Sequence, residues 1–485
     1  MIKKGTPTLQ NPIKLIFTFS LSSWINFVIG VLATVITTRI FEPEVYGLIN
    51  IFNVTSGTLM SILCLGLDGS YIRFYHEPPQ SNDQKQLVFK LLSISLFMVV
   101  IVGGLISIFF YPSFSEAVFG RTSWFLSVMV FASAFSTIVL RFLTITYRMR
   151  FNARQYTIQN ILVQFVTKIF IVCAALINPN VETVVVFNVG GLFILTLVYL
   201  FLQRKDILPE QKSISLKGYG EVVKFAIFNS PTLIITNANI LVSQLIIART
   251  LNNEAVGIFA SANVFVAILN VLKGGLGTYW SPFMYSNYKT EQVKIIKVHN
   301  YVMLTLLVVL AGLVIFKDLI YVMIGSNYHG SKEFFALLLV VPILSMAAET
   351  TAYGIPISKK NHLTLINNII GVTVNLGACI LLIHLWGLKG AALASCISAI
   401  IIFSLNTYFG QKYYISVESI KKTILGVVLI ILMALATILI SSTQFLIPFV
   451  ILIVLMGAVL FSREVRIIVN LIKTKVIKSK VITKS

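Results

Sequence analysis

Three basic side chains, Arg141, Lys168 and Lys273, interrupt long apolar stretches of the sequence. Asp68 lies at the end of another apolar stretch, and Glu349 lies within one. An ionisable group in an apolar environment is costly, so such groups usually face a water-filled cavity or one another. Lysine and arginine in that setting can hold an anion through charge-assisted hydrogen bonds, whereas a carboxylate can bind and release a proton or a cation. These residue types therefore predict anion binding and ion coupling.

The two lysines differ in their sequence surroundings. Lys168 lies near the middle of an apolar stretch, on a helical face that it shares with Asn160 and Gln164. Its ammonium group is predicted to bind an anion beside these amides, although it could equally neutralise a structural carboxylate. Lys273 lies toward one end of its stretch, where it could line the same cationic cavity or extend to the membrane surface.

A nine-residue motif occurs twice, 210 residues apart. Arg39-x-x-x-Pro-Glu-x-x-Gly47 is matched by Arg249-x-x-x-Asn-Glu-x-x-Gly257. A membrane protein whose halves repeat in this way is expected to form two similar bundles with a site between them. Arg39 and Arg249 are candidate anion ligands in that cavity. In the alternative, structural role, each arginine bonds the last carbonyls of its own helix or pairs with the glutamate of its motif.

Polar side chains recur at helical spacing inside the apolar stretches. Thr236 and Asn239 share one helical face, Asn53 follows the first copy of the motif, and Asn263 and Asn270 follow the second. Such stripes predict a hydrated cavity, because polar groups that face lipid would be unsatisfied. Close helix packing through small residues is the alternative, but it accounts poorly for the asparagines.

Arg141 and Glu349 lie 208 residues apart, close to the repeat offset, and at a similar predicted depth. We expect them to form a charge-paired gate when one mouth of the cavity closes; separate structural roles in the two halves are the alternative. Two similar bundles with a site between them are typical of transporters. In a transporter, Asp68 and Glu349 are the carboxylates expected to couple transport to H⁺ or Na⁺, unless Asp68 only caps a loop. No cofactor or metal site is predicted, because the 4 cysteines and 5 histidines have no spacing typical of one.

The composition assigns these residues to a bilayer. Hydrophobic residues make up 57% of the 485 residues and charged residues 11%. The core of a water-soluble domain could not bury so large a share of hydrophobic residues. We predict an all-α polytopic membrane protein with about 14 transmembrane helices, arranged as two six-helix lobes related by the repeat plus two C-terminal helices. The spans are expected near residues 14–38, 47–68, 88–111, 124–147, 157–177 and 182–202, then 224–248, 255–277, 300–323, 334–357, 363–385 and 389–409, and finally 422–441 and 445–462.

The expected domains are an N-terminal lobe (1–210), a C-terminal lobe (211–412), the two extra helices (413–462) and a basic tail (463–485). The net charge of +21 is concentrated on one set of alternating loops, which predicts that both termini are cytoplasmic. This distribution leaves nothing for a nucleic-acid partner to explain. The basic tail, interspersed with Val, Ile and Leu, is expected to lie on anionic membrane lipids, with a disordered tail or a partner contact as alternatives.

The carboxylates and histidines of the sequence do not favour catalysis. Membrane-embedded glycosyltransferases and polymerases generally need carboxylates or histidines gathered on a sizeable external loop or cleft. Glu42 and Glu44 are the only nearby external carboxylate pair in the first half, and they more simply interact with a helix N-terminus. We therefore do not expect an enzyme.

Two segments carry a family resemblance. The Arg39–Gly47 motif resembles the turn between the first two helices of bacterial polysaccharide flippases. The stretch Asn367-Asn368-x-x-Gly371…Asn375…Gly387-Leu-Lys-Gly390-Ala-Ala-Leu-Ala-Ser395 resembles their eleventh and twelfth helices. With the 14-span layout, the whole chain is similar to the Wzx-type O-antigen and polysaccharide flippases, in the polysaccharide transporter branch of the multidrug/oligosaccharidyl-lipid/polysaccharide exporter superfamily.

The resemblance implies translocation of an undecaprenyl-diphosphate-linked oligosaccharide, an O-antigen or other surface polysaccharide repeat unit, from the cytoplasmic to the outer leaflet by alternating access. It implies a bacterial cytoplasmic (inner) membrane location, with a polysaccharide polymerase and chain-length machinery as further partners. A multidrug or peptidoglycan lipid-precursor exporter of the same superfamily is the alternative. A multi-span glycosyltransferase or a membrane scaffold is a more distant one.

Overall fold

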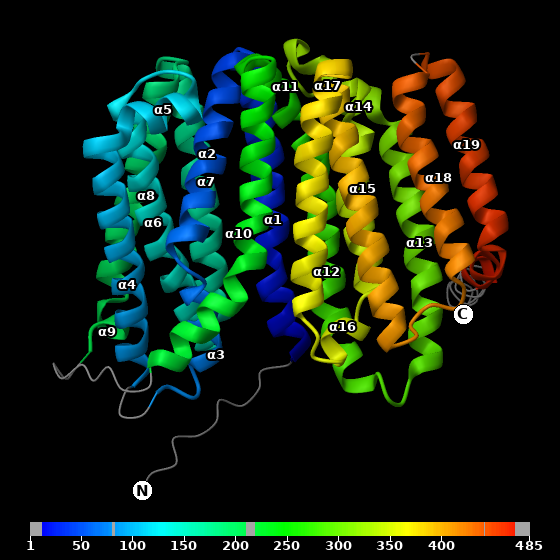
Figure 1. The fold of residues 1–485 in the computed structure, drawn as a ribbon, viewed down its shortest axis with the longest axis horizontal. Helices are drawn as coiled ribbons and strands as arrows, with labels where there is room; N and C mark the ends of the chain where they lie inside the picture. The colour runs from blue at the N-terminus through cyan, green and yellow to red at the C-terminus, as the bar shows by residue number, and fades with distance from the viewer. Residues whose placement is uncertain (1–11, 80–82, 210–218, 441, 471–485) are drawn as a thin grey trace, which may run out of the picture. The chain divides into compact units, whose positions relative to one another are not determined.

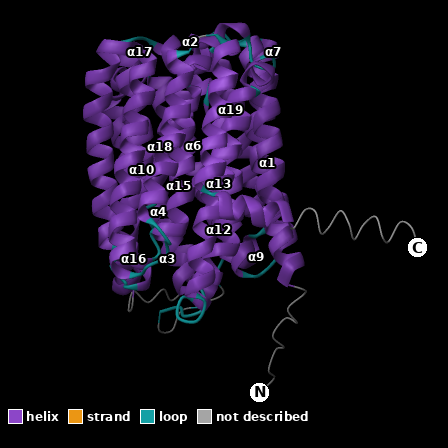
Figure 2. Cartoon of the chain, turned by 90° about the vertical axis from the view of Figure 1, so that its right-hand side faces the viewer, coloured by secondary structure: helices purple, strands orange, loops and turns teal. Residues whose placement is uncertain are grey.

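The computed structural model describes residues 12–79, 83–209, 219–440 and 442–470. Every regular element in these ranges is helical, and they contain no strand (Figure 2). The prediction of an all-α chain is confirmed.

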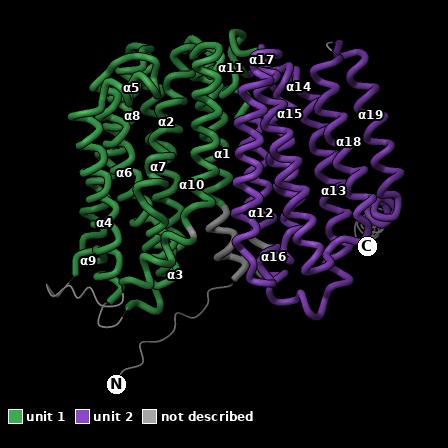
Figure 3. The backbone as a smooth tube through the Cα atoms, viewed as in Figure 1, with its two compact units in different colours: residues 1–264, 324–329 green, residues 265–323, 330–485 purple. Residues whose placement is uncertain are grey.

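The chain divides into two compact units, Met1–Val264 with Ile324–His329, and Phe265–Met323 with Gly330–Ser485 (Figure 3). The helices of unit 1 are α1 (Pro12–Ile40), α2 (Pro43–Leu63), α3 (Leu67–Phe74), α4 (Gln84–Leu105), a π-helical turn η1 (Ile106–Phe110), α5 (Tyr111–Phe119), α6 (Trp124–Met149), α7 (Ala153–Ile177), α8 (Val181–Leu202), α9 (Arg204–Ile207), α10 (Tyr219–Thr250) and α11 (Asn253–Ser261).

Unit 2 contains most of α12 (Asn263–Asn287), followed by α13 (Gln292–Ile315), α14 (Lys317–Tyr321), α15 (Phe335–Thr351), α16 (Gly354–Ile357), α17 (His362–Tyr413), α18 (Ile420–Leu439) and α19 (Thr443–Leu460). The 3₁₀ segment η2 (Ser326–Glu333) begins in unit 1 and ends in unit 2. The contact-defined boundary therefore follows α11, whereas the predicted lobe boundary lies at residue 210. The lobes defined by the repeat stay a prediction.

Eleven helices of the described residues are long and apolar enough to cross a membrane, and the number rises to 13 if each of two bent helix pairs is one span. The chain is thus a multi-pass membrane protein, and this count does not reach the predicted 14. The count treats α17 as a single span of 52 residues, although the backbone of α17 is non-helical at Trp386 and Gly387. Gly387 has φ +56° and ψ −133°, a conformation that glycine alone adopts readily, so the sequence itself places this interruption.

The core of unit 1 lies along α6. Its buried face carries Val130, Ala134, Ile138 and Phe142, spaced four residues apart. Leu91 on α4 belongs to the same buried cluster. The opposite face of α6 carries polar residues that are partly exposed or exposed. Packing of the buried face against the core fixes the position of the helix.

The break between α2 and α3 positions Asp68. Leu65 and Gly66 both have positive φ, 51° and 70°, which ends α2 and starts the short helix α3 at Leu67. Asp68 is therefore in the first turn of α3, where a carboxylate is favoured by the helix dipole.

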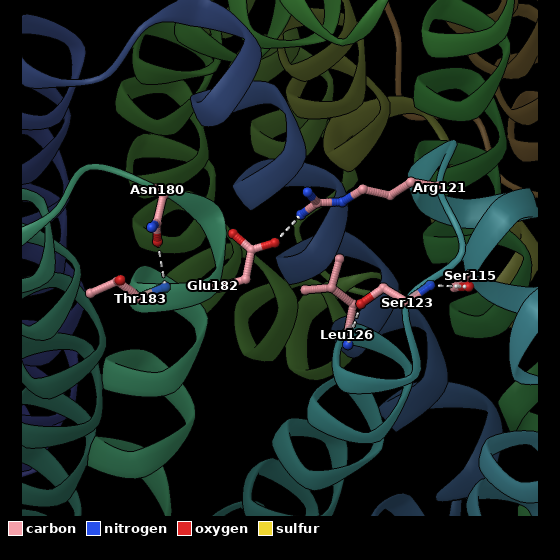
Figure 4. Close-up of polar contacts among 7 residues, drawn as sticks. All are labelled: Ser115, Arg121, Ser123, Leu126, Asn180, Glu182 and Thr183. Atoms are coloured by element: carbon pink, nitrogen blue, oxygen red, sulfur yellow. Dashed lines mark hydrogen bonds and ion pairs between the residues drawn. The ribbon is translucent and has the colours of Figure 1, made fainter.

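Polar contacts fix the turns at one end of unit 1, near α5 and the start of α8 (Figures 1 and 4). The Asn180 side chain caps α8 by accepting a hydrogen bond from the Thr183 amide at 2.8 Å. Arg121 pairs with Glu182 at 2.6 Å, but 42% and 46% of these two side chains are exposed. The cap is thus the better shielded of the two interactions.

We expect Asn180→Ala to lower the free energy of unfolding by about 1 kcal/mol, because it leaves an N-terminal amide of α8 without its acceptor. Arg121→Ala should cost less, about 0.5 kcal/mol, because water and salt screen an exposed pair. Thermal unfolding of the purified variants measures both, and a larger loss for Arg121→Ala would contradict this ranking.

Candidate functional site

A cavity of about 240 Å³ lies within unit 1, between α2, α6, α7 and α8. It is lined by Met60, Thr137, Leu140, Arg141, Thr144, Ile145, Arg148, Tyr156, Asn160, Val163 and Leu192. We call it the arginine pocket, since two arginines of α6 share it with apolar side chains. Six of its eleven lining side chains are polar, so the cavity offers hydrogen-bonding groups beside apolar walls.

Arg141 is oriented by a carboxylate. Its Nε donates to Oδ2 of Asp68 at 3.1 Å, and 49% of the Arg141 side chain is exposed against 13% of Asp68. The predicted partner of Arg141, Glu349, belongs to unit 2, where it is partly exposed on α15. The Arg141–Glu349 gate stays a prediction, while the ion pair with Asp68 holds the guanidinium group at the pocket wall.

Arg148 lies two turns further along α6 and lines the same pocket. The arginines at positions 141 and 148 occupy one face because seven residues make nearly two helical turns. Both are exposed rather than buried. Two guanidinium groups on one wall present several N–H donors in the planar arrangement that matches carboxylate and phosphate oxygens.

Helix α7 supplies the polar groups on the other side of the pocket. Asn160 donates to the carbonyl of Tyr156 at 3.0 Å, and both residues line the cavity. Gln164 and Lys168 follow on α7 and are partly exposed, but they are not among the lining residues. Of the three residues predicted to act together, Asn160, Gln164 and Lys168, only Asn160 lines the arginine pocket.

A second cavity, about 380 Å³, lies at the end of unit 1 that carries the α1–α2 turn. Its charged lining residues are Arg249, Glu44 and Glu254. Gly120 has φ +74°, and a methyl group built on it would lie 3.4 Å from the Arg249 guanidinium. Arg249 therefore lies with both motif glutamates around one polar cavity, whereas Arg39 is exposed at the end of α1 outside that lining.

The remaining predicted residues are placed individually. Asn53 on α2, Thr236 on α10, and Asn263 and Asn270 on α12 are exposed; Asn239 on α10 is partly exposed. In unit 2 the Lys273 ammonium donates to the Ser345 hydroxyl at 2.5 Å. The prediction that these residues line one hydrated cavity stays a prediction. Among the described residues, no three His, Cys, Asp or Glu side chains are grouped as they would be to hold a metal ion.

Sequence reasoning missed Arg148 and Tyr156. The predicted span ended at residue 147, so Arg148 was assigned to a loop, whereas α6 continues to Met149. The seven-residue spacing from Arg141 was the signal that could have placed both arginines on one helical face.

Comparison with protein families settles the relationship of this chain. Residues 13–287 match the family described as polysaccharide biosynthesis protein. The chain belongs to this family. The match includes both copies of the motif and the whole arginine pocket. A comparison with curated proteins finds no match.

Solved structures show the same fold. A structure described as the lipid II flippase MurJ in an inward closed conformation is 15% identical and has a TM-score of 0.68; the alignment covers 92% of this chain and 99% of that one. The MATE multidrug transporter DinF-BH, solved as a complex, is 14% identical with a TM-score of 0.61, and the alignment covers 84% of this chain and 97% of that one. The polysaccharide transporter resemblance is confirmed, and this chain has a MurJ- and MATE-like transporter fold.

Proposed function

We propose that this protein is a flippase that moves an undecaprenyl-diphosphate-linked oligosaccharide, such as an O-antigen repeat unit, from the cytoplasmic to the outer leaflet of a bacterial inner membrane. The observation that carries the proposal is the arginine pocket, in which Arg141 and Arg148 share a wall within a membrane-spanning unit. The family match and the fold similarity to a lipid II flippase support it.

The pocket chemistry suits a diphosphate headgroup. A diphosphate cannot cross hydrocarbon unaided, but guanidinium groups can replace part of its hydration by charge-assisted hydrogen bonds. Asp68 limits the net positive charge beside Arg141, which keeps binding weak enough for release. The polyprenyl chain can stay in the lipid while the protein shelters the phosphates and sugars.

The fold similarity to MurJ and to a MATE transporter supports a second candidate, a peptidoglycan-precursor or multidrug exporter. The test is leaflet-resolved translocation in proteoliposomes. Fluorescent undecaprenyl-diphosphate oligosaccharides are compared with lipid II and with a cationic rhodamine dye. Translocation of the oligosaccharides supports the proposal. Well-folded protein that moves only lipid II or only the dye would replace it with the corresponding alternative.

Ion coupling is proposed at Asp68. Its carboxylate is 13% exposed, beside the pocket and paired with Arg141, so a proton or Na⁺ that competes for it would release the guanidinium group. Asp68→Asn should therefore abolish the dependence of transport on a pH or Na⁺ gradient while leaving a slow, gradient-independent rate. Transport measured with each gradient imposed separately checks this, and full coupled transport in Asp68→Asn would exclude Asp68 as the coupling residue.

A further inference from the structure

Helices α13, α18 and α19 of unit 2 lie side by side (Figure 1), and three polar residues join them at one end. Asn300 on α13 donates its amide nitrogen Nδ2 to Glu418 Oε2 at 3.0 Å and to Glu464 Oε1 at 2.8 Å. Glu418 lies in the connection before α18, and Glu464 lies four residues after the end of α19. We call these three residues the amide–carboxylate cluster. One amide thus brings together two carboxylates from different segments.

Two oxygen atoms of the cluster are buried without a hydrogen-bond donor among the described residues. They are Asn300 Oδ1 and Glu464 Oε2, and the two residues are 1% and 4% exposed. A buried acceptor is costly unless it is hydrogen-bonded, and a buried carboxylate is costly unless its charge is paired. The cluster therefore carries more acceptors than the neighbouring described side chains satisfy.

Arg463 compensates only part of the negative charge. Its Nη1 lies 3.7 Å from Glu418 Oε1, beyond hydrogen-bond distance, and 61% of the Arg463 side chain is exposed. Water and salt screen such a pair, so it contributes little. Among the described residues, the buried Glu464 has no ion-pair partner, and its carboxylate meets only the neutral Asn300 amide.

The residue before Asn300 holds the cluster in position. His299 is fully buried, and its two ring nitrogens are hydrogen-bonded to the Thr350 hydroxyl of α15 at 2.7 Å and the Thr423 hydroxyl of α18 at 2.9 Å. Because α18 starts two residues after Glu418, the same contacts keep Glu418 close to α13. Ligands held in place in this way lose little conformational entropy when they bind.

We propose that the amide–carboxylate cluster binds a hard metal cation, Ca²⁺ or Na⁺, and that the bound ion ties α18 and α19 to α13. Carboxylate and amide oxygens are the ligands that such cations prefer, and Ca²⁺ takes about six to eight oxygens, water included, in flexible geometry. A half-turn of the Asn300 amide presents Oδ1 in place of Nδ2, so that the amide oxygen joins the four carboxylate oxygens.

The charge of the cluster favours the divalent ion. Two carboxylates match the charge of Ca²⁺, so Ca²⁺ should bind more tightly than Na⁺. The cluster combines two carboxylates with one amide, and it is therefore distinct from a group of three His, Cys, Asp or Glu side chains, which the described residues lack. This inference goes beyond the proposed function and does not depend on it.

The test measures cation binding to the full-length protein, purified in detergent and freed of Ca²⁺ and Na⁺. Equilibrium dialysis with radioactive Ca²⁺ or Na⁺ gives the affinity, and thermal unfolding at increasing cation concentration gives an independent readout. The parent should bind the cation saturably and unfold at a higher temperature as its concentration rises. Glu464→Gln should lower the affinity at least about tenfold, a loss that even changes outside the ligand shell cause.

The stability of Glu464→Gln without cation separates binding from a structural role. Glutamine keeps the shape and the acceptor of Glu464 but removes one of two neighbouring negative charges. The cation-free variant should therefore be at least as stable as the cation-free parent, and it should lose the cation-dependent rise. A purely structural role predicts the reverse, a loss of stability that is the same with and without cation.

Glu333 supplies the matched control. It is another glutamate of unit 2, its side chain is 60% exposed, and it pairs with Lys389 at 2.7 Å. Glu333→Gln removes the same charge and should leave cation affinity within about a factor of two, because exposed charges are screened. Arg463→Gln should instead raise the affinity about two- to fivefold, since it removes a positive charge beside Glu418.

Saturable binding of either cation that is lost in Glu464→Gln supports the site. No saturable binding by the parent, or equal binding by the parent and Glu464→Gln, overturns it. Stabilisation of the parent by acid alone, with no effect of either cation, also overturns it and assigns a proton to the carboxylates. If Glu464→Gln does not fold, Glu418→Gln is measured in its place. Because no measurement uses the transported lipid, failure of the proposed function leaves these results unchanged.

Discussion

Transport of a diphosphate-linked lipid should fall at least a hundredfold when Arg141 and Arg148 are both replaced by glutamine. Each hydrogen bond to a charged group contributes about 1.5–3 kcal/mol, so losing one from each arginine removes about 3–6 kcal/mol of headgroup stabilisation. At 1.4 kcal/mol per factor of ten, this corresponds to a loss of about two to four orders of magnitude. Leaflet-resolved translocation by the purified variant, with folding checked by thermal unfolding, measures it.

Arg73 supplies the matched control for this prediction. It is another arginine of unit 1, it pairs at 2.8 Å with Glu77, which lies four residues later in the sequence, and it does not line the arginine pocket. Arg73→Gln removes the same charge and should leave transport within a factor of two. A folded Arg141→Gln/Arg148→Gln variant that transports at the parental rate would remove the pocket from the mechanism.

The single variants separate binding from structure. If Arg141 served only to neutralise Asp68, Arg141→Gln and Asp68→Asn would cost similar stability and similar transport, and the double change would restore both. If Arg141 binds phosphate, Asp68→Asn leaves the guanidinium group in place and the two variants differ in their apparent affinity for the headgroup. The measured quantity is the substrate concentration for half-maximal transport.

The helices were predictable because their apolar runs are long and continuous. The six first-half runs correspond to α1, α2, α4 with α5, α6, α7 and α8. Side-chain partners were not predictable in the same way. The Asp68–Arg141 pair depends on the turn at Leu65 and Gly66, whose positive φ angles redirect the chain after α2. Nothing in an apolar run ending in Cys-Leu-Gly-Leu-Asp specifies that direction.

The repeat was visible in the sequence, but its meaning at the atomic level was not. The motif predicted a binding role for its charged residues Arg39 and Arg249, which are exposed at the ends of α1 and α10. The glycines of the same motif, Gly47 and Gly257, make a close contact between the repeats, because a residue without a Cβ lets two backbones touch. A pattern of glycines indicates close approach, and only the structure identifies what approaches.

The contacts of segment 324–329 were likewise not predictable, because the segment lies in a short loop between two predicted spans. In the structure it belongs to unit 1, where Gly325 donates its backbone amide to the Thr38 hydroxyl at 3.2 Å. Tyr328 is fully buried, its hydroxyl donates to the Phe41 carbonyl at 2.9 Å, and its ring meets that of Tyr46 edge-on at 5.5 Å. A loop later in the sequence is thus fastened to the α1–α2 turn by one aromatic side chain.

Tyr328→Ala is therefore expected to lower the free energy of unfolding by about 3–5 kcal/mol, because it leaves a large cavity in a buried site. Tyr328→Phe keeps the ring but leaves the Phe41 carbonyl unpaired, so it should cost about 1–3 kcal/mol. The Tyr408 side chain, 62% exposed on α17, is the control, and Tyr408→Ala should change stability by less than about 0.5 kcal/mol. Thermal and denaturant unfolding of the purified variants rank their stabilities. A Tyr328→Ala protein as stable as Tyr408→Ala would mean that Tyr328 does not hold the segment.

Phe41 lies two residues before Pro43, so Tyr328 also anchors the turn from which α2 begins. Loosening this turn should reduce transport together with stability.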